Sequence, residues 1–156
     1  MIDQIYCVNF SIFLEPLWTQ TVPEITLQFD NEIIHAGALR EPTEFQYCSP
    51  MLRSGDYCIK LEFHNKDDQE QILYARDMAV KIRHLRFENQ TNDFSFFGNY
   101  RPTYPSHWIE ENHQKGINLD PVIKSNYLGW NGTWYIDINL PIFYWIHKTT
   151  NLGWLI

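Results

Sequence analysis

The sequence predicts an all-β fold, an antiparallel β-sandwich, from three observations. Apolar and polar residues alternate with a period of two over residues 25–29, 57–65 and 132–140. Gly, Pro and Asn turns separate five or six short strands at intervals of about 8–15 residues. The chain shows no alternation of helices and strands, which a parallel sheet would need. With 156 residues it fits one domain, residues 1–156.

The first predicted element is a hairpin. Residues 25–29 form one strand, residues 32–36 form the next, and Asp30-Asn31 makes the two-residue turn between them. Further strands are predicted over 43–47 and 57–65; the second has one apolar and one polar face, as expected for a strand with one side in water.

Residues 78–87 predict a strand with an irregularity. Apolar residues alternate up to Ile82 and take the opposite phase from Leu85 onward. One extra residue near Arg83-His84 would produce this slip, which indicates a β-bulge. A helix is the alternative, because part of the apolar pattern also fits a period of 3.6 residues.

The last third of the chain predicts three elements. Residues 99–120 have little periodicity and form a long ordered loop rich in aromatic residues. Residues 132–140 form a strong strand. Pro141 can begin a short helix, so residues 141–156 are predicted to be a C-terminal extension.

Composition excludes several classes of partner. The net charge is -7 and only 12 residues are Lys or Arg, which opposes a surface that binds nucleic acid. No apolar run reaches the roughly 20 residues that span a bilayer, and the N-terminal residues do not resemble a secretory signal. The three cysteines have no disulfide-framework spacing, which favours synthesis in a reducing compartment.

Catalytic motifs are not evident in the sequence. The six histidines include no H-E-x-x-H pattern, and no G-x-S-x-G nucleophile motif occurs. We therefore predict that the protein is not an enzyme and that it has no cofactor, with calcium as the one exception considered.

Oxygen-bearing side chains flank two predicted strands and suggest a calcium site. They converge at one end of the sandwich if those strands are neighbours, and calcium binds six to eight such oxygens. The alternative is an acidic turn exposed to water. The predicted ligands are Asn65, Asp67, Asp68 and Asp77.

Aromatic residues crowd the last third of the chain, in a number that one small core cannot fully bury. Such rings either anchor protein interfaces or stack on sugar faces. The segment after residue 150 is apolar and lacks charged side chains, so it also predicts a partner. The predicted interface residues are Tyr100, Tyr104, Trp108, Trp145, Trp154 and Leu155.

Four segments carry a resemblance to known proteins: 56–66, 77–82, 127–134 and 141–145. The third contains the motif Leu-Gly-Trp-Asn-Gly-x-Trp. Together they resemble small proteins of tailed bacteriophages, especially marine and cyanobacterial phages. The order of strand, acidic loop, Asp77 and apolar strand is also similar to calcium-dependent xylan-binding modules. These resemblances imply a jelly-roll sandwich like that of carbohydrate-binding modules, with Asp77 and residues 65–68 as metal ligands.

Two functions are therefore expected, and a hydrolase is disfavoured. The first is a structural virion protein of the capsid, tail, baseplate or fibre, assembled in the host cytoplasm. It would dock on other virion proteins, as an oligomer, through its aromatic loop and apolar C-terminus. The alternative is a calcium-dependent module that binds host-surface glycans.

Overall fold

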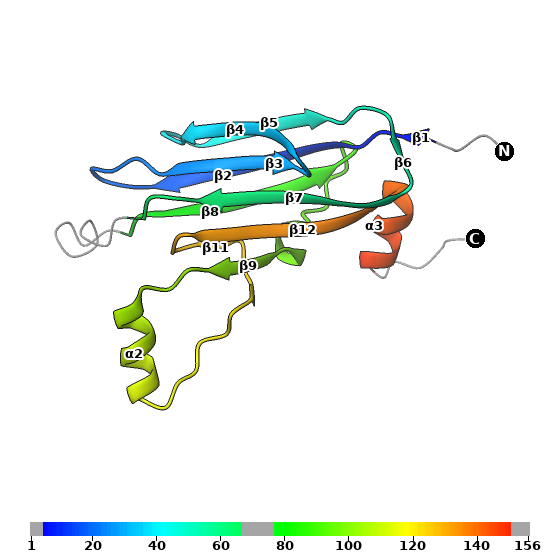
Figure 1. Ribbon diagram of the computed structural model, residues 1–156. Coiled ribbons are helices and arrows are strands. Elements are labelled where there is room, and N and C mark those ends of the chain that lie inside the picture. The colour runs from blue at the N-terminus through cyan, green and yellow to red at the C-terminus, as the bar shows by residue number, and fades with distance from the viewer. Residues whose placement is uncertain (1–4, 67–76, 151–156) are drawn as a thin grey trace.

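The computed structural model describes residues 5–66 and 77–150 of the chain. Two antiparallel sheets pack face to face, with a third pair of very short strands beside them (Figure 1). The predicted antiparallel β-sandwich is therefore confirmed.

The larger sheet has six strands in the order β10-β9-β12-β7-β3-β4. Its central pair, β12 and β7, is in register over the whole of both strands. The strand bounds are β3 Glu24–Phe29, β4 Glu32–Ala38, β7 Gly55–Phe63, β9 Asn99–Pro102, β10 Ile123–Lys124 and β12 Gly132–Leu140.

The smaller sheet has four strands in the order β11-β8-β2-β5. Its strands are β2 Asn9–Leu17, β5 Thr43–Cys48, β8 Ala79–Phe87 and β11 Tyr127–Leu128. The short pair consists of β1 Ile5–Tyr6 and β6 Leu52–Arg53, and the helices are η1 Ser95–Phe97, α2 Ser106–Gln114 and α3 Ile142–Thr150.

Several predicted elements occur where the sequence placed them. The first hairpin is β3 and β4, and Asp30 at its turn has a φ of 48°. The slip in residues 78–87 is a bulge in a strand: Phe13 pairs with His84 while Leu14 pairs with Ile82, which leaves Arg83 as the extra residue. The alternative of a helix in this segment is wrong.

The core lies between the sheets and includes rings from both. Phe10 of β2 contacts Phe29 of β3, at 6.3 Å between ring centroids, and Phe87 of β8 at 6.1 Å. Trp134 of β12 is fully buried, and its indole occupies the space that a side chain at position 98 would need. A Cβ atom on Gly98 would lie 2.2 Å from that indole, so only glycine fits there.

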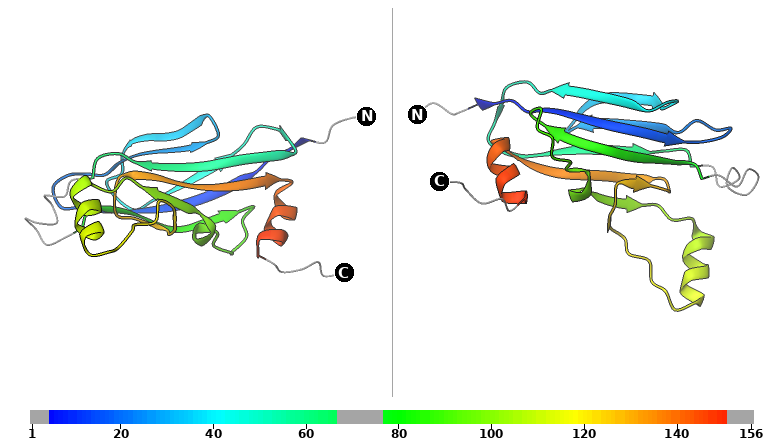
Figure 2. Two further views of the ribbon diagram at one scale, coloured as in Figure 1. Left: turned by 60° about the horizontal axis from the view of Figure 1, so that its bottom comes forward. Right: turned by 180° about the vertical axis from the view of Figure 1, so that it is seen from behind.

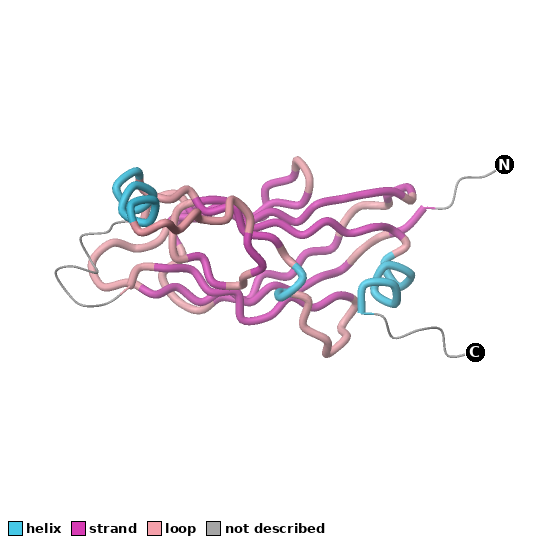
Figure 3. Tube along the Cα trace, turned by 90° about the horizontal axis from the view of Figure 1, so that it is seen from below, coloured by secondary structure: helices cyan, strands magenta, loops and turns pink. Residues whose placement is uncertain are grey.

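The two α-helices lie at opposite ends of the sandwich (Figure 3). Helix α3 closes one end, near β1, and the predicted C-terminal helix is thus present. Helix α2 projects away from the sheets at the other end, as the right-hand view in Figure 2 shows. Among the helices of the described residues, none is long and apolar enough to cross a membrane.

The region predicted as a loop over 99–120 is partly regular. It begins with strand β9 and contains helix α2, whose N-cap is Pro105. The sequence pattern did not show this helix because none of its residues is buried, and apolar periodicity arises only where a helix face packs.

Candidate functional site

A hollow of about 350 Å³ lies where the turn between β11 and β12 meets β9, the residues after the end of β7 and the residues before the start of β8. Both sheets contribute to it: Tyr127 belongs to β11 of the small sheet, and Tyr100 to β9 of the large one. We call it the Trp130 hollow. Its side chains are mainly polar or aromatic, and they include Lys66, Asp77, Tyr100, Tyr104, Tyr127 and Trp130.

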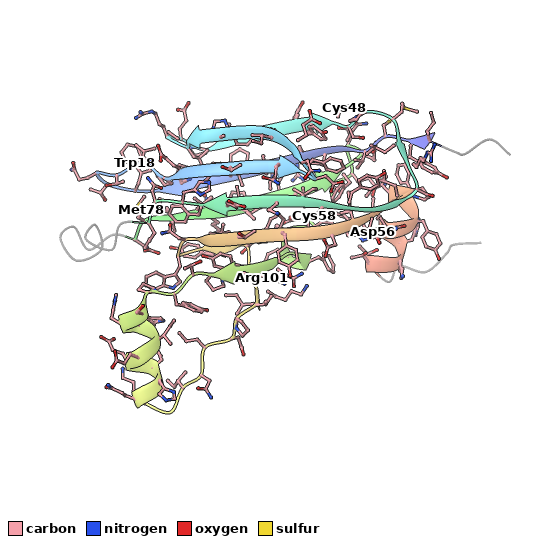
Figure 4. All side chains as sticks on the ribbon, in the orientation of Figure 1. Trp18, Cys48, Asp56, Cys58, Met78 and Arg101 are labelled. Carbon is pink, nitrogen blue, oxygen red and sulfur yellow. The ribbon has the colours of Figure 1, made fainter. Side chains whose placement is uncertain are left out.

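An ion pair forms the polar side of the Trp130 hollow. Lys66 Nζ donates a hydrogen bond to Asp77 Oδ1 and a second one, of 2.6 Å, to the carbonyl oxygen of Met78. Tyr127 donates its hydroxyl proton to Asp77 Oδ2 at 2.5 Å. The side chain of Lys66 is 4% exposed and that of Asp77 is 32% exposed, so the carboxylate is the member of the pair that meets solvent. Figure 4 shows Met78 at the end of the sandwich that carries α2.

Tyr104 and Trp130 line the other side of the hollow, and Trp108 packs beside Trp130. The Trp130 ring lies 6.0 Å from the ring of Trp108, measured between centroids, and 6.5 Å from that of Tyr104. Lys66 Nζ lies 5.4 Å from the Trp130 centroid, a cation–π distance. Trp108, which belongs to α2, is 38% exposed. The cluster is therefore open to a ligand on one side and fixed by a buried cation on the other.

The backbone of Trp130 is held by Tyr100. The Tyr100 hydroxyl donates to the carbonyl oxygen of Trp130 and accepts from its amide at 3.1 Å. The next residue adds two bonds: the Asn131 side chain accepts from the Lys66 amide, and its carbonyl accepts from the Thr103 amide, both at 2.6 Å. These bonds connect the turn to β7 and β9, so the hollow is formed before any ligand arrives.

Glycine is required directly after this turn. Gly132 has a φ of 151°, and a Cβ atom there would lie 2.3 Å from the carbonyl oxygen of Arg101 on the paired strand. The clash would be with backbone, which cannot rotate away. Figure 4 shows Arg101 on β9 at this edge of the sheet.

The tyrosines of the hollow stay protonated at neutral pH. Burial raises the pKa of Tyr100. Burial, together with the hydrogen bond to Asp77 and its negative charge, raises the pKa of Tyr127. Burial and the charge of Asp120 raise the pKa of Tyr104. All three hydroxyl groups therefore stay neutral, and that of Tyr100 is already used by the backbone of Trp130.

The predicted interface residues separate into three groups. Tyr104 lines the Trp130 hollow, and the rings of Tyr104 and Trp108 each contact the Trp130 ring. Tyr100 is 1% exposed and Trp145 is 9% exposed, so the prediction of interface contacts is corrected for both, because their rings pack in the core. Trp154 and Leu155 lie outside the described residues.

Two of the four predicted calcium ligands, Asn65 and Asp77, lie in the described residues, and both bond to protein groups. Asn65 caps a strand, since its Oδ1 accepts from the Glu24 amide at 2.7 Å and its Nδ2 donates to the Val22 carbonyl at 2.9 Å. Asp77 has Lys66 as its countercharge. Asp67 and Asp68 lie outside the described residues. Within residues 5–66 and 77–150, no group of three or more His, Cys, Asp or Glu could hold a metal ion.

The predicted site residues did not include Lys66, Tyr127 or Trp130. Tyr127 and Trp130 belong to the segment that carries the resemblance to phage proteins, and the indole of Trp130 in a glycine-flanked turn was the available signal. Lys66 lies in the resembling segment 56–66, but no sequence pattern indicated its ion pair with Asp77, eleven residues away.

No family model and no curated protein sequence matches the chain. Among solved structures, vCBM60 in its selenomethionine form, described with two families of calcium-dependent carbohydrate-binding modules, is 12% identical and has a TM-score of 0.48. The match covers 82% of this chain and 88% of that one. vCBM60 in complex with galactobiose is 14% identical over 83% of this chain and 95% of that one, with the same TM-score of 0.48. A likeness at this level carries no argument about the site, and the predicted relation to phage proteins stays a prediction.

Proposed function

We propose that the protein is a non-catalytic carbohydrate-binding module and that the Trp130 hollow holds the sugar. The observation that supports this is the combination of open aromatic rings with a fixed, outward-facing carboxylate. Sugars have apolar C–H faces and hydroxyl groups around their edge, and a site for them needs both kinds of contact.

The aromatic side supplies the apolar contact. Rings of Trp108 and Trp130 leave apolar surface in water, and covering this surface with a sugar face is favourable by about 25 cal/mol per Å². A core function does not account for these rings, since Trp108 is attached to a helix that buries no residue.

The polar side supplies hydrogen bonds in a fixed geometry. Asp77 and Tyr127 are bonded to each other, and Lys66 fixes Asp77 from behind. Because the groups are already ordered, a ligand does not lose free energy by ordering them. A hollow of about 350 Å³ also lies in the size range of small-molecule sites, roughly 300–1,000 Å³.

Calcium is not needed to neutralise Asp77, because Lys66 does so. We therefore propose that sugar binding at the Trp130 hollow is the same in calcium and in a chelator. This proposal departs from the calcium-dependent form of glycan binding predicted from the sequence.

The test compares Trp130→Ala with Phe143→Ala in binding to a panel of immobilised polysaccharides. Phe143 is a matched control, because it is an aromatic residue 51% exposed on α3, at the opposite end of the sandwich. We expect Trp130→Ala to weaken binding at least tenfold and Phe143→Ala to leave it unchanged, with both variants folded by circular dichroism. Equal binding by Trp130→Ala, or no binding by the unaltered protein, would overturn the proposal.

A chelator arm addresses the metal. Binding is measured by isothermal titration calorimetry with millimolar calcium and with excess EDTA. Equal affinities in calcium and in EDTA support a site in which Lys66, and not calcium, neutralises Asp77. Loss of binding in EDTA would be consistent with a carbohydrate-binding function but would contradict the proposal that the site works without calcium.

A virion role is a second proposal, favoured by one observation. Helix α3 leaves Phe143 about half exposed, and the residues that follow it, 151–156, are apolar in sequence. Deletion of 151–156 tests this role: an unchanged melting temperature with loss of oligomers or of incorporation into particles supports it. A lower melting temperature with unchanged assembly would reject it.

A further inference from the structure

The chemistry of the Trp130 hollow also defines the class of sugar, an inference that rests on the proposed function. We infer that the hollow selects uncharged, hydroxyl-bearing glycans and rejects glycans whose sugars carry a carboxylate, such as uronic acids. The reason is that Asp77 and Tyr127 accept hydrogen bonds there, while the cation of the hollow, Lys66, is buried.

The acceptor atoms are those of Asp77 and Tyr127. Tyr127 uses its single proton on Asp77 Oδ2, so the phenol oxygen offers lone pairs to a ligand. Asp77 Oδ2 keeps a free lone pair direction, since a carboxylate oxygen accepts more than one bond. A ligand at this place must therefore donate, as sugar hydroxyl groups do and an ionised carboxylate does not.

The cation of the hollow has no capacity left for a ligand. An ammonium group has three protons, and Lys66 directs two of them to Asp77 and to the Met78 carbonyl. The ammonium group itself lies over the Trp130 ring, 5.4 Å from its centroid. With 4% of its side chain exposed, Lys66 stabilises Asp77 and Trp130 but does not reach a bound carboxylate.

The neighbouring basic groups are directed elsewhere. Lys124 Nζ donates to the Phe97 carbonyl at 3.1 Å, while the preceding residue, Ile123, lines the hollow. The Arg101 guanidinium lies 5.2 Å from the centroid of the Tyr135 ring and donates to its hydroxyl at 3.3 Å. Asp120 adds a second negative charge near Tyr104. A carboxylate entering the hollow would meet these negative groups without a compensating cation.

Matched ligands test the inference. Binding of the unaltered protein is measured to galactose and glucose oligomers and to galacturonate and glucuronate oligomers of the same length and linkage. The methyl esters of the uronates are included, because they keep the sugar and remove the charge. We expect acidic oligomers to bind at least tenfold more weakly than neutral ones, the esters to recover most of that loss, and the difference to shrink at high salt.

Two variants identify the cause. Asp77→Asn leaves Lys66 without its countercharge, so the preference for neutral over acidic oligomers should vanish or reverse. Tyr127→Phe removes a hydroxyl without changing charge, so both affinities should fall while their ratio stays the same. If Asp77→Asn does not fold, the esters, the salt series and Tyr127→Phe still decide.

The outcomes separate the two proposals. If neither neutral nor acidic sugars bind, the proposed function fails. If acidic oligomers bind as tightly as neutral ones, or if a folded Asp77→Asn keeps the original preference, the carbohydrate-binding function stands and this inference is overturned.

Discussion

Helices α2 and α3 have the same length, nine residues each, and opposite relations to the core. Helix α3 buries Ile142, Trp145 and Ile146, and the Trp145 ring lies 5.4 Å from the rings of both Phe87 and Phe94. Helix α2 buries no residue. Its Trp108 contacts the ring of Trp130, in a turn that belongs to the proposed site.

The difference shows where stability and binding are located in this fold. An isolated helix of nine residues is marginal in water, so each helix depends on tertiary contacts. Those of α3 are in the core, and their loss would expose the end of the sandwich. Those of α2 are at the Trp130 hollow, so changes in α2 should alter binding while leaving the sandwich intact.

The largest effect is expected at α3. Replacement Trp145→Ala removes a nearly buried ring between Phe87 and Phe94, and such changes cost about 3–5 kcal/mol. The free energy of unfolding from urea denaturation measures this loss. A change below 1 kcal/mol, on the scale of ordinary surface substitutions, would mean that α3 does not close the core.

A smaller effect is expected at Tyr100, which belongs to the core and also holds Trp130. Tyr100→Phe leaves the Trp130 amide and carbonyl without their partner, at a cost of about 1–3 kcal/mol for buried groups. Sugar binding should weaken as well, because the ring of Trp130 is less firmly placed. Lower stability with unchanged binding would show that Tyr100 is structural only.

Alkaline pH should lower stability through the tyrosines. The pKa values of Tyr47, Tyr100 and Tyr127 are raised in the folded state above the ordinary value of about 10. The folded state then binds more protons than the unfolded state above pH 10, so stability is fully present below about pH 10 and falls as the pH rises further. Unfolding free energies between pH 8 and pH 11 measure this slope, and Tyr100→Phe should reduce it. A flat profile would contradict the burial of these hydroxyl groups.

The smallest effect on stability is expected at α2. Trp108→Ala should change the free energy of unfolding by no more than about 0.5 kcal/mol, as for exposed positions. Sugar binding should nevertheless decrease, because one ring of the aromatic cluster is lost. A large loss of stability would show that α2 supports the fold as α3 does, and the contrast between the two helices would disappear.

The sequence by itself determined most of the sandwich. Alternation at residues 57–65 and 132–140 predicted the central strands β7 and β12, and the phase slip near Arg83 predicted the bulge in β8. These features are local, because a strand with one buried face repeats every two residues. Helix α2 buries no face and therefore had no such pattern.

Only the tertiary structure decided which aromatic residues are core and which form the site. Trp145 and Trp108 both belong to nine-residue helices, yet the ring of Trp145 packs against Phe87 and Phe94 and that of Trp108 against Trp130. The ion pair of Lys66 with Asp77 was likewise not predicted, since Lys66 follows β7 and Asp77 precedes β8, and these strands belong to different sheets. Periodicity reports which side of its own strand or helix a residue occupies, whereas a site depends on which strands and helices become neighbours when the sheets pack.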